Sequence, residues 1–291
     1  MKKIRILVVL IFIVSCIVYG VYTVRENATK DRNVPVIAFE EDEISVSNDM
    51  TEEELLAGVT ASDIEDGDIS ESVQIASISR FMSGGKRIVK YIVFDEANNL
   101  GSAERVAVLE DYVPPRIYMK VPFRAYEDDP SGSNNAGALI AMDEFDGDLT
   151  EEMSVSIEDG PIEDVGLYHI ELKVSNSLGD SCRIQIEWEV LNSSDPSEKS
   201  KYYPELSDYI FYTKVGEPLD FASYLTGIAS MSEKFVFGAG STPSNITKDK
   251  VSIDSSAVDY STPGEYRVYY SYTTRGGVTA TTTAYVVVEG E

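Results

Sequence analysis

Cysteine, histidine and tryptophan are nearly absent from this 291-residue chain, which holds two, one and one of them. Cys16 lies in an apolar N-terminal run, so Cys182 stands alone in the rest and no disulfide framework can form there. The single histidine also excludes a zinc site built on histidines. A Ser-His-Asp or Cys-His catalytic site would have to use His169. Its place between Tyr168 and Ile170, on the outward face of an alternating strand, argues against such a role, and we expect no enzymatic activity.

Basic residues are also scarce. The chain has 24 Lys and Arg against 50 Asp and Glu, which gives a net charge of −26. Such a surface repels phosphate backbones, so nucleic acid is not expected as a partner. No glycine-rich phosphate loop or nucleophile elbow appears either. The acidic surface attracts cations and basic partners, or it serves solubility alone. A hydrophobic content of 43% is high enough for folded cores and too high for a disordered chain.

The N-terminus combines a basic start at 1–5 with an uncharged apolar run at 6–24. A spanning helix needs about 20 apolar residues, and the flanking Lys and Arg would hold the start in the cytoplasm. We therefore predict a single-pass signal anchor in the cell membrane, with the C-terminal part extracellular. Two alternatives export the same part: a lipoprotein anchored at Cys16, from the sequence Ile-Val-Ser-Cys, and a secreted protein with a cleaved signal peptide. The length of the run and the apolar residues after Cys16 favour the uncleaved anchor.

An acidic motif is repeated in the exported part. Residues 61–70 and 141–150 both contain Asp-x-x-Asp-Gly-Asp followed by an aliphatic residue and a hydroxyl residue. Gly67 and Gly147 are 80 positions apart. A fixed period indicates that one structural unit was copied. A third unit lacks this motif but keeps Gly264-x-Tyr266 before an alternating strand, as in Gly166-x-Tyr168. The predicted segments are a cytoplasmic start (1–5), a transmembrane anchor (6–24), a tether (25–33), domain 1 (34–113), domain 2 (114–192), a linker (193–201) and domain 3 (202–291).

Short alternating strands, frequent turn signals and the lack of long helical patterns predict antiparallel β-sandwiches. The Asp-x-x-Asp-Gly-Asp motif, then Gly-x-Tyr before a strand, then Asp or Asn and a Leu-Gly turn resemble the bacterial surface-protein Ig-like domain, common in exported proteins of Gram-positive bacteria. The resemblance implies an all-β chain with three tandem immunoglobulin-like antiparallel β-sandwiches after one N-terminal transmembrane helix. It also implies a spacer, stalk or adhesive role and not an enzyme, and it identifies no ligand.

The two acidic loops supply the candidate metal ligands. Calcium takes about six to eight oxygens, and three carboxylates in one loop provide a part of them. Asp95 can join the first loop if its own loop folds nearby, and its counterpart in the second repeat is Asn176. The alternative is a glycine turn in which the Asp side chains bond local backbone amides and no cofactor is bound. The candidate calcium ligands are Asp63, Asp66, Asp68, Asp143, Asp146 and Asp148.

These observations predict a non-enzymatic, membrane-anchored surface protein whose Ig-like modules act as a stalk or protein-interaction scaffold. The alternative is an adhesin or carbohydrate-binding surface module, stabilised by calcium. The expected partner is a surface protein or a wall glycan, with membrane contact through residues 6–24. In the third domain, alternation places Tyr269 outside and Tyr266, Tyr270 and Tyr272 inside, which argues against a platform of exposed tyrosines for sugars.

Overall fold

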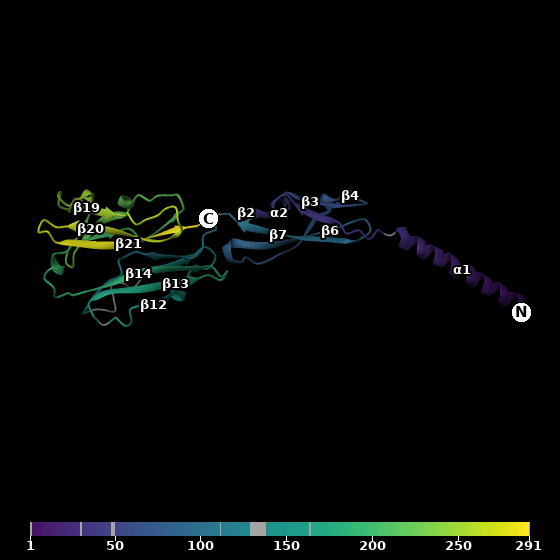
Figure 1. Cartoon of the computed structure of the whole chain (residues 1–291), viewed down its shortest axis with the longest axis horizontal. Helices are drawn as coiled ribbons and strands as arrows, with labels where there is room; N and C mark the ends of the chain where they lie inside the picture. The colour runs from purple at the N-terminus through teal and green to yellow at the C-terminus, as the bar shows by residue number, and fades with distance from the viewer. Residues whose placement is uncertain are drawn as a thin grey trace. The chain divides into compact units, whose positions relative to one another are not determined.

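The computed structural model of the chain forms two compact units, Met1–Tyr112 and Val113–Glu291 (Figure 1). The structure describes residues 2–29, 31–47, 50–110, 112–128, 138–162 and 164–290. Met1, Lys30 and Glu291, which belong to the predicted start, tether and third domain, lie outside the described residues.

The chain begins with one long apolar helix, α1 (Lys2–Thr29). Its stretch Ile4–Arg25 has 22 residues, a mean hydropathy of 2.7 and no burial against the rest of the chain. About 20 apolar residues cross the hydrocarbon core of a bilayer, so α1 has the length and composition of a membrane anchor or a signal sequence. The predicted span 6–24 lies inside it.

Unit 1 continues as two facing sheets. One contains β1 (Val36–Phe39), β3 (Val59–Asp63) and β4 (Gly67–Asp68), in the order β1-β3-β4. The other contains β2 (Glu43–Val46), β5 (Gln74–Ile78), β6 (Lys86–Phe94) and β7 (Leu100–Leu109), in the order β2-β7-β6-β5. The short helix α2 (Glu52–Leu56) has a capping box formed by Thr51 and Glu54. The core between the sheets contains Val89 and Tyr91, both fully buried.

Unit 2 repeats this pair of sheets twice. The first pair joins β8 (Arg116–Met119), β10 (Leu139–Asp143) and β11 (Gly147–Asp148) in one sheet, and β9 (Arg124–Tyr126), β12 (Ser154–Ile157), β13 (Gly166–Ser175) and β14 (Ser181–Leu191) in the other. In the second pair, one sheet contains β15 (Tyr203–Leu206), β17 (Leu225–Ala229) and β18 (Lys234–Val236). The other sheet contains β16 (Ile210–Lys214), β19 (Val251–Asp254), β20 (Gly264–Thr273) and β21 (Thr279–Glu289). Short 3-10 turns, distributed over both units, are η1 (Ser70–Ser72), η2 (Ser83–Gly85), η4 (Thr150–Glu152), η5 (Glu198–Ser200), η6 (Phe221–Tyr224) and η7 (Lys248–Lys250).

The three sandwiches share one topology, which confirms the all-β fold with three tandem sandwiches. Their four-stranded sheets run in the orders β2-β7-β6-β5, β9-β14-β13-β12 and β16-β21-β20-β19. One pair in each sheet is parallel, namely β2 with β7, β9 with β14 and β16 with β21, whereas we predicted antiparallel pairing only. Alternation of apolar residues has the same period in both kinds of pairing, so the sequence pattern does not distinguish them.

The predicted faces of the long strands are confirmed. In β13 the side chains of Ile170 and Leu172 are fully buried, and the strand pairs along its whole length with β14. In β20 the side chains of Tyr270 and Tyr272 are buried, while Tyr269 is 37% exposed. The inward tyrosines therefore belong to the core, as the alternation indicated.

The Gly-x-Tyr motif forms a small corner before β13 and β20. The hydroxyl of Tyr168 donates to the carbonyl of Asp164 at 2.9 Å, and that of Tyr266 donates to the carbonyl of Thr262 at 2.9 Å. A tyrosine that bonds the backbone a few residues upstream is a recurrent device of immunoglobulin-like sandwiches. The motif that marked the repeat in the sequence thus fixes how the chain enters its longest hairpin.

The two sandwiches of unit 2 pack against each other. The hydroxyl of Tyr212, in β16, accepts from the backbone nitrogen of Ile117 in β8 and donates to its carbonyl, both at 2.9 Å. Arg116 makes a two-pronged ion pair with Glu289 at 3.0 and 2.5 Å. One hydrophobic cluster extends through both sandwiches. Strand β8 is an edge strand, so the tyrosine hydroxyl occupies backbone groups that would otherwise lack a neighbouring strand.

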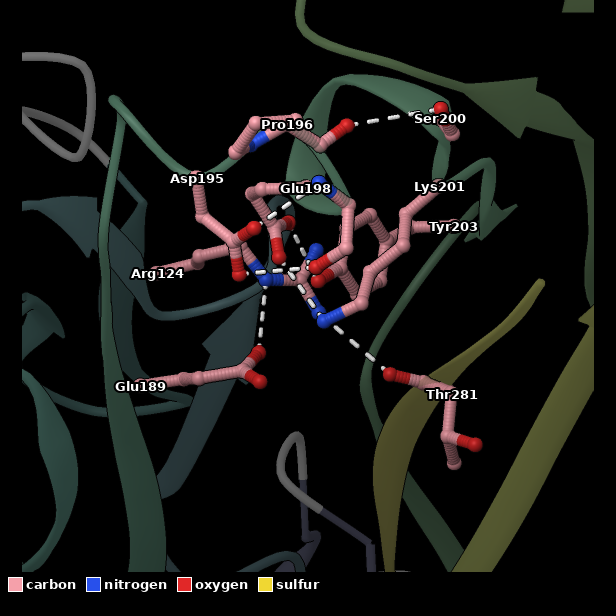
Figure 2. A network of polar contacts seen from close by, with 10 residues as sticks. Arg124, Glu189, Asp195, Pro196, Glu198, Ser200, Lys201, Tyr203 and Thr281 are labelled. Carbon is pink, nitrogen blue, oxygen red and sulfur yellow. Dashed lines mark hydrogen bonds and ion pairs between the residues drawn. The ribbon is translucent and has the colours of Figure 1, made fainter.

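Residues 193–201, predicted as a linker, are folded around a buried carboxylate (Figure 2). Glu198 in η5 is 3% exposed, and it accepts from the Tyr203 hydroxyl at 2.6 Å and from Lys201 Nζ at 2.8 Å. The guanidinium of Arg124 lies 3.6 Å from the centre of the Tyr203 ring, and its Nε donates to Glu189 at 2.7 Å. Buried charges are stable where they are paired and hydrogen-bonded, as here. The polar composition that indicated a linker is also the composition of this network.

Candidate metal centre

The two acidic motifs fold into equivalent tight hairpins. Strand β3 ends at Asp63, which pairs with Gly67, and β10 ends at Asp143, which pairs with Gly147. Both glycines have a φ of +75°, in the left-handed region that residues with a Cβ rarely adopt. The glycine of Asp-Gly-Asp is therefore required by the turn itself, in both repeats.

The last aspartate of each motif is engaged by the turn that follows. Asp68 Oδ1 accepts from the backbone nitrogen of Ser70 at 3.0 Å and from its hydroxyl at 2.6 Å. Asp148 Oδ1 accepts from Thr150 in the same way, at 3.0 and 2.6 Å. The hydroxyl hydrogen bond and then the backbone one lower the pKa of both carboxyls, because both favour the charged form.

The middle aspartate of each motif ties its hairpin to a second loop. Asp66 Oδ2 accepts from the backbone nitrogen of Glu96 at 2.8 Å. Asp146 accepts from the backbone nitrogen of Ser177 at 2.5 Å and from its hydroxyl at 2.8 Å. Asp68 and Asp148 thus make the local turn hydrogen bonds of the alternative interpretation, whereas Asp66 and Asp146 bond the backbone of a loop 30 and 31 residues further along the chain.

The remaining aspartate of the first motif belongs to a different cluster. One carboxylate oxygen each from Asp31, Asp63 and Asp95 lies within 4.8 Å of the other two. Asp63 and Asp95 are buried, with exposures of 8% and 7%, and Asp31 is half-buried. Within the described part of the chain, this is the one group of three such side chains close enough to share an ion.

Asp63 has one oxygen in use and one without a partner. Its Oδ1 accepts from the backbone nitrogens of Glu65 and Asp66, at 2.8 and 3.3 Å. Its Oδ2 is buried and has no hydrogen-bond partner among the described residues. A buried charged oxygen without a partner is costly, and a buried carboxylate is normally paired or bound to a metal.

Hydrogen bonds hold the other two carboxylates in place. Asp95 accepts from the backbone nitrogen and the side-chain amide of Asn99, both at 2.7 Å. Asp31 Oδ1 accepts from the backbone nitrogen of Asn33 at 2.8 Å and from its amide at 2.9 Å. The Asn99 amide also reaches the Asp31 carbonyl at 3.4 Å, so the segment before β1 is joined to the β6–β7 turn.

Gly101 allows this segment to lie close to β7. A Cβ at Gly101 would lie 3.0 Å from the carbonyl carbon of Pro35 and would overlap its oxygen. Any larger residue would therefore push the segment away from the strand. The Leu-Gly turn noted in the sequence thus has a steric role in unit 1.

In the second repeat, an uncharged amide occupies the position that corresponds to the Asp95 carboxylate. Asn176 takes the position of Asp95, and its Nδ2 donates to Asp143 Oδ2 at 3.0 Å. Both side chains are 7% exposed. The oxygen that is unpartnered in Asp63 is therefore satisfied in its counterpart. The sequence pairs Asp95 with Asn176, but nothing in the repeated motif indicates Asp31, which lies in the predicted tether.

The signal that identifies Asp31 is its spacing. Asp111 lies 80 positions further along the chain, the same interval that separates Asp63 from Asp143. Asp111 itself lies outside the described residues.

The first loop is also strongly negative: the pKa of Glu65 is raised, first by the charge of Asp31 and then by partial desolvation and the neighbouring carboxylates. Such a field attracts cations.

His169 lies on β13, away from these loops in the sequence. Its Nδ1 is 2.9 Å from Asp159 Oδ2, its backbone nitrogen donates to the same oxygen at 2.6 Å, and its side chain is 42% exposed. The backbone and then the ring hydrogen bond lower the pKa of Asp159. This is a partly exposed His–Asp pair on the outward face of a strand, as the alternation predicted.

Comparison with known families and with curated proteins finds no match. Several solved structures match with TM-scores near 0.2. They include Clostridium perfringens ZmpB with its M60 catalytic and CBM51 domains (13% identity over 90% of this chain and 31% of that one, TM-score 0.23) and its CBM51-2 and INT domains in complex with GlcNAc (23% over 49% and 29%, TM-score 0.22). Drosophila N-cadherin EC1-4 matches with 12% identity over 90% and 76%, at a TM-score of 0.21.

The chain spans about a third of the length of the first two of these structures. With TM-scores this low, the similarity to these structures does not indicate a function for the chain. The fold is established by the strands themselves, which define a chain of β-sandwiches behind an N-terminal apolar helix.

Proposed function

We propose that the protein is a non-enzymatic, membrane-anchored surface protein whose sandwiches act as a stalk or interaction scaffold. The observation that carries this proposal is one apolar helix followed by three copies of a single sandwich topology. The helix exposes large apolar side chains such as Phe12 and Ile11, at 68% and 62%. A contiguous apolar surface of this kind needs a membrane or another cover, because soluble proteins rarely expose one.

The motif resemblance supports an extracellular location. The paired Asp-Gly-Asp loops and the Gly-x-Tyr corners are those that resemble the bacterial surface-protein Ig-like domain, a module of exported Gram-positive proteins. The charge of −26 suits a soluble extracellular part and a partner with a basic surface, and it disfavours nucleic acid. A surface protein or a wall component is the class of partner that follows.

Cell fractionation tests the proposal. We expect the full chain in the membrane fraction, with its C-terminal part cleaved by protease added to intact cells. Globomycin treatment and the substitution Cys16→Ser should leave the protein's size and location unchanged, because an uncleaved anchor does not use the cysteine. A shift in either would indicate a lipoprotein. Recovery in the cytosol or the medium would contradict the anchored stalk.

A second candidate function, carbohydrate binding, is favoured by one hollow in unit 2. The hollow has a volume of about 220 Å³, and its lining includes Phe123, Arg124, Glu187 and Tyr269. Aromatic side chains together with a few polar groups that fix a ligand's orientation are typical of the lining of ligand-binding hollows. Titration of wall-derived glycan fragments, followed by NMR on unit 2 resonances, tests this function. Binding that is lost in Tyr269→Ala would support it, and the lack of any shift would exclude these fragments as ligands.

A further inference from the structure

We propose that Asp31, Asp63 and Asp95 bind one calcium ion, which fastens the segment between α1 and β1 to the first sandwich. This site differs from the six-aspartate set expected from the motifs, and it shares only Asp63 with that set. It goes beyond the stalk function and does not depend on it, because the three carboxylates belong to the first sandwich whatever role the sandwiches have together.

The unpartnered oxygen of Asp63 is the first argument for the ion. Asp63 Oδ2 is buried without a hydrogen-bond partner among the described residues, in a side chain that is 8% exposed. The carboxylates of Asp31 and Asp95 lie within 4.8 Å of that of Asp63. Three negative charges at this spacing repel one another. A divalent cation removes the repulsion and supplies the missing partner at the same time.

The second repeat provides an internal comparison. There Asn176 stands at the position of Asp95, and its amide donates to Asp143 Oδ2 at 3.0 Å. A hairpin with the same motif, the same glycine conformation and the same register is therefore satisfied by an amide. Since the turn does not require a third carboxylate, the carboxylate at Asp95 indicates a different demand in the first repeat, namely ligation.

The ligand set favours calcium over magnesium. Calcium accepts about six to eight oxygens in flexible geometries, whereas magnesium keeps most of its water and uses one or two carboxylates. Three carboxylates from three separate segments suit the larger ion, with water completing its shell. Asp31 comes from the segment before β1, Asp63 from the end of β3, and Asp95 from the turn after β6.

The origin of the ligands determines what the ion would do. Asp63 and Asp95 belong to hairpins that are paired within the sandwich, whereas Asp31 belongs to the chain that arrives from α1. Bound calcium would therefore hold residues 31–35 against the β6–β7 turn. Removal of the calcium would leave three mutually repelling carboxylates, and we then expect residues 31–35 to detach from the β6–β7 turn.

Calorimetric titration of the full chain in detergent, after removal of metals with a chelator, measures the binding. We expect one calcium site with a dissociation constant of roughly 10⁻⁴–10⁻³ M, the range of extracellular modules. Asp95→Asn should weaken binding by about tenfold or more, because it removes one charged ligand. The second repeat shows that an asparagine fits this position, so the variant should fold, as circular dichroism will verify.

Asp143→Asn is the control: it replaces a buried aspartate of the second repeat at the counterpart of Asp63, because the counterpart of Asp95 is already Asn176. It should leave the affinity unchanged. No calcium binding by the wild-type chain would overturn the proposal. An Asp95→Asn affinity equal to wild type, or loss of binding in Asp143→Asn, would overturn this ligand set.

The rate of trypsin cleavage after Arg32 shows whether residues 31–35 are held against the sandwich. Calcium should slow this cleavage in the wild-type chain and not in Asp95→Asn, while cleavage after Arg275, in the loop between β20 and β21, should not respond. Magnesium at the same concentration should protect much less. Equal protection by magnesium would overturn the assignment to calcium. Binding without protection at Arg32 would overturn the fastening role.

Discussion

Replacing Tyr212 by phenylalanine removes a hydroxyl that serves two backbone groups of the neighbouring sandwich. The hydroxyl accepts from the Ile117 nitrogen and donates to the Ile117 carbonyl, each at 2.9 Å, and it lies 3.6 Å from the sulfur of Cys182. Burial is the first cause of the raised pKa of Tyr212, and the residue is half-buried. Among the residues that the structure describes, no strand pairs with this edge of β8.

The expected cost follows from these contacts. A buried backbone group left without a partner costs about 1–3 kcal/mol. The nitrogen and the carbonyl of Ile117 are only partly buried here, so we apply this range to the pair. We therefore expect Tyr212→Phe to lower the free energy of unfolding of unit 2 by about 1–3 kcal/mol. For a unit of this size, each kcal/mol lowers the melting temperature by about 2–4 °C.

Tyr168→Phe is a closely matched control. Its hydroxyl accepts from the backbone nitrogen of Asp164 at 3.1 Å and donates to its carbonyl at 2.9 Å, but in an exposed corner of the same unit. Water can replace that hydroxyl, so the cost should stay within about 0.5 kcal/mol. Calorimetric melting of the full chain in detergent compares the two variants. Equal melting temperatures for Tyr212→Phe and Tyr168→Phe would refute the bridging role of Tyr212.

Three further outcomes are expected. Glu198→Ala should lower the free energy of unfolding of unit 2 by about 1–3 kcal/mol in chemical denaturation, because it leaves the buried Tyr203 hydroxyl without its acceptor; a cost near zero would show that 193–201 behaves as a free linker. Gly101→Ala should cost unit 1 about 1–3 kcal/mol in thermal melting, since its Cβ would overlap the Pro35 carbonyl, and an unchanged melting temperature would contradict this close approach. The free energy of unfolding should also fall as the pH rises above about 10, where the tyrosines of the unfolded chain ionise. The buried tyrosines of the folded chain have a raised pKa. Their contribution to stability is therefore complete below this pH and is lost as the pH rises further. The buried tyrosines whose pKa desolvation raises most are Tyr203, Tyr209, Tyr212, Tyr270 and Tyr285. Circular dichroism with tyrosinate absorbance measures this loss, and a flat melting temperature up to about pH 12 would contradict it.

Local features of the chain could be predicted from the sequence because each depends on neighbouring residues. The apolar helix follows from an uninterrupted apolar run, and the faces of β13 and β20 follow from a period of two. The helix α2 follows from its capping box, and the copied hairpins follow from the Asp-Gly-Asp motif and its glycine turn. Such signals depend on steric and hydrogen-bonding preferences within a few residues.

Long-range placement was decided by the tertiary structure. Parallel pairing of β2 with β7 joins strands separated by most of a domain, and alternation is the same in either direction. The fold turns the polar segment 193–201 into a network around the buried Glu198, although its composition is that of a linker.

The candidate calcium site shows the same division. The sequence by itself determined that Asp63 and Asp143 sit in equivalent turns, because the motif and its glycine specify them locally. Only the packing of three distant segments brings Asp31 and Asp95 to Asp63, and only packing sets Asn176 against Asp143. Carboxylates in one motif look alike in the sequence. Their role depends on which oxygens the surrounding chain satisfies and which single oxygen it leaves buried without a partner.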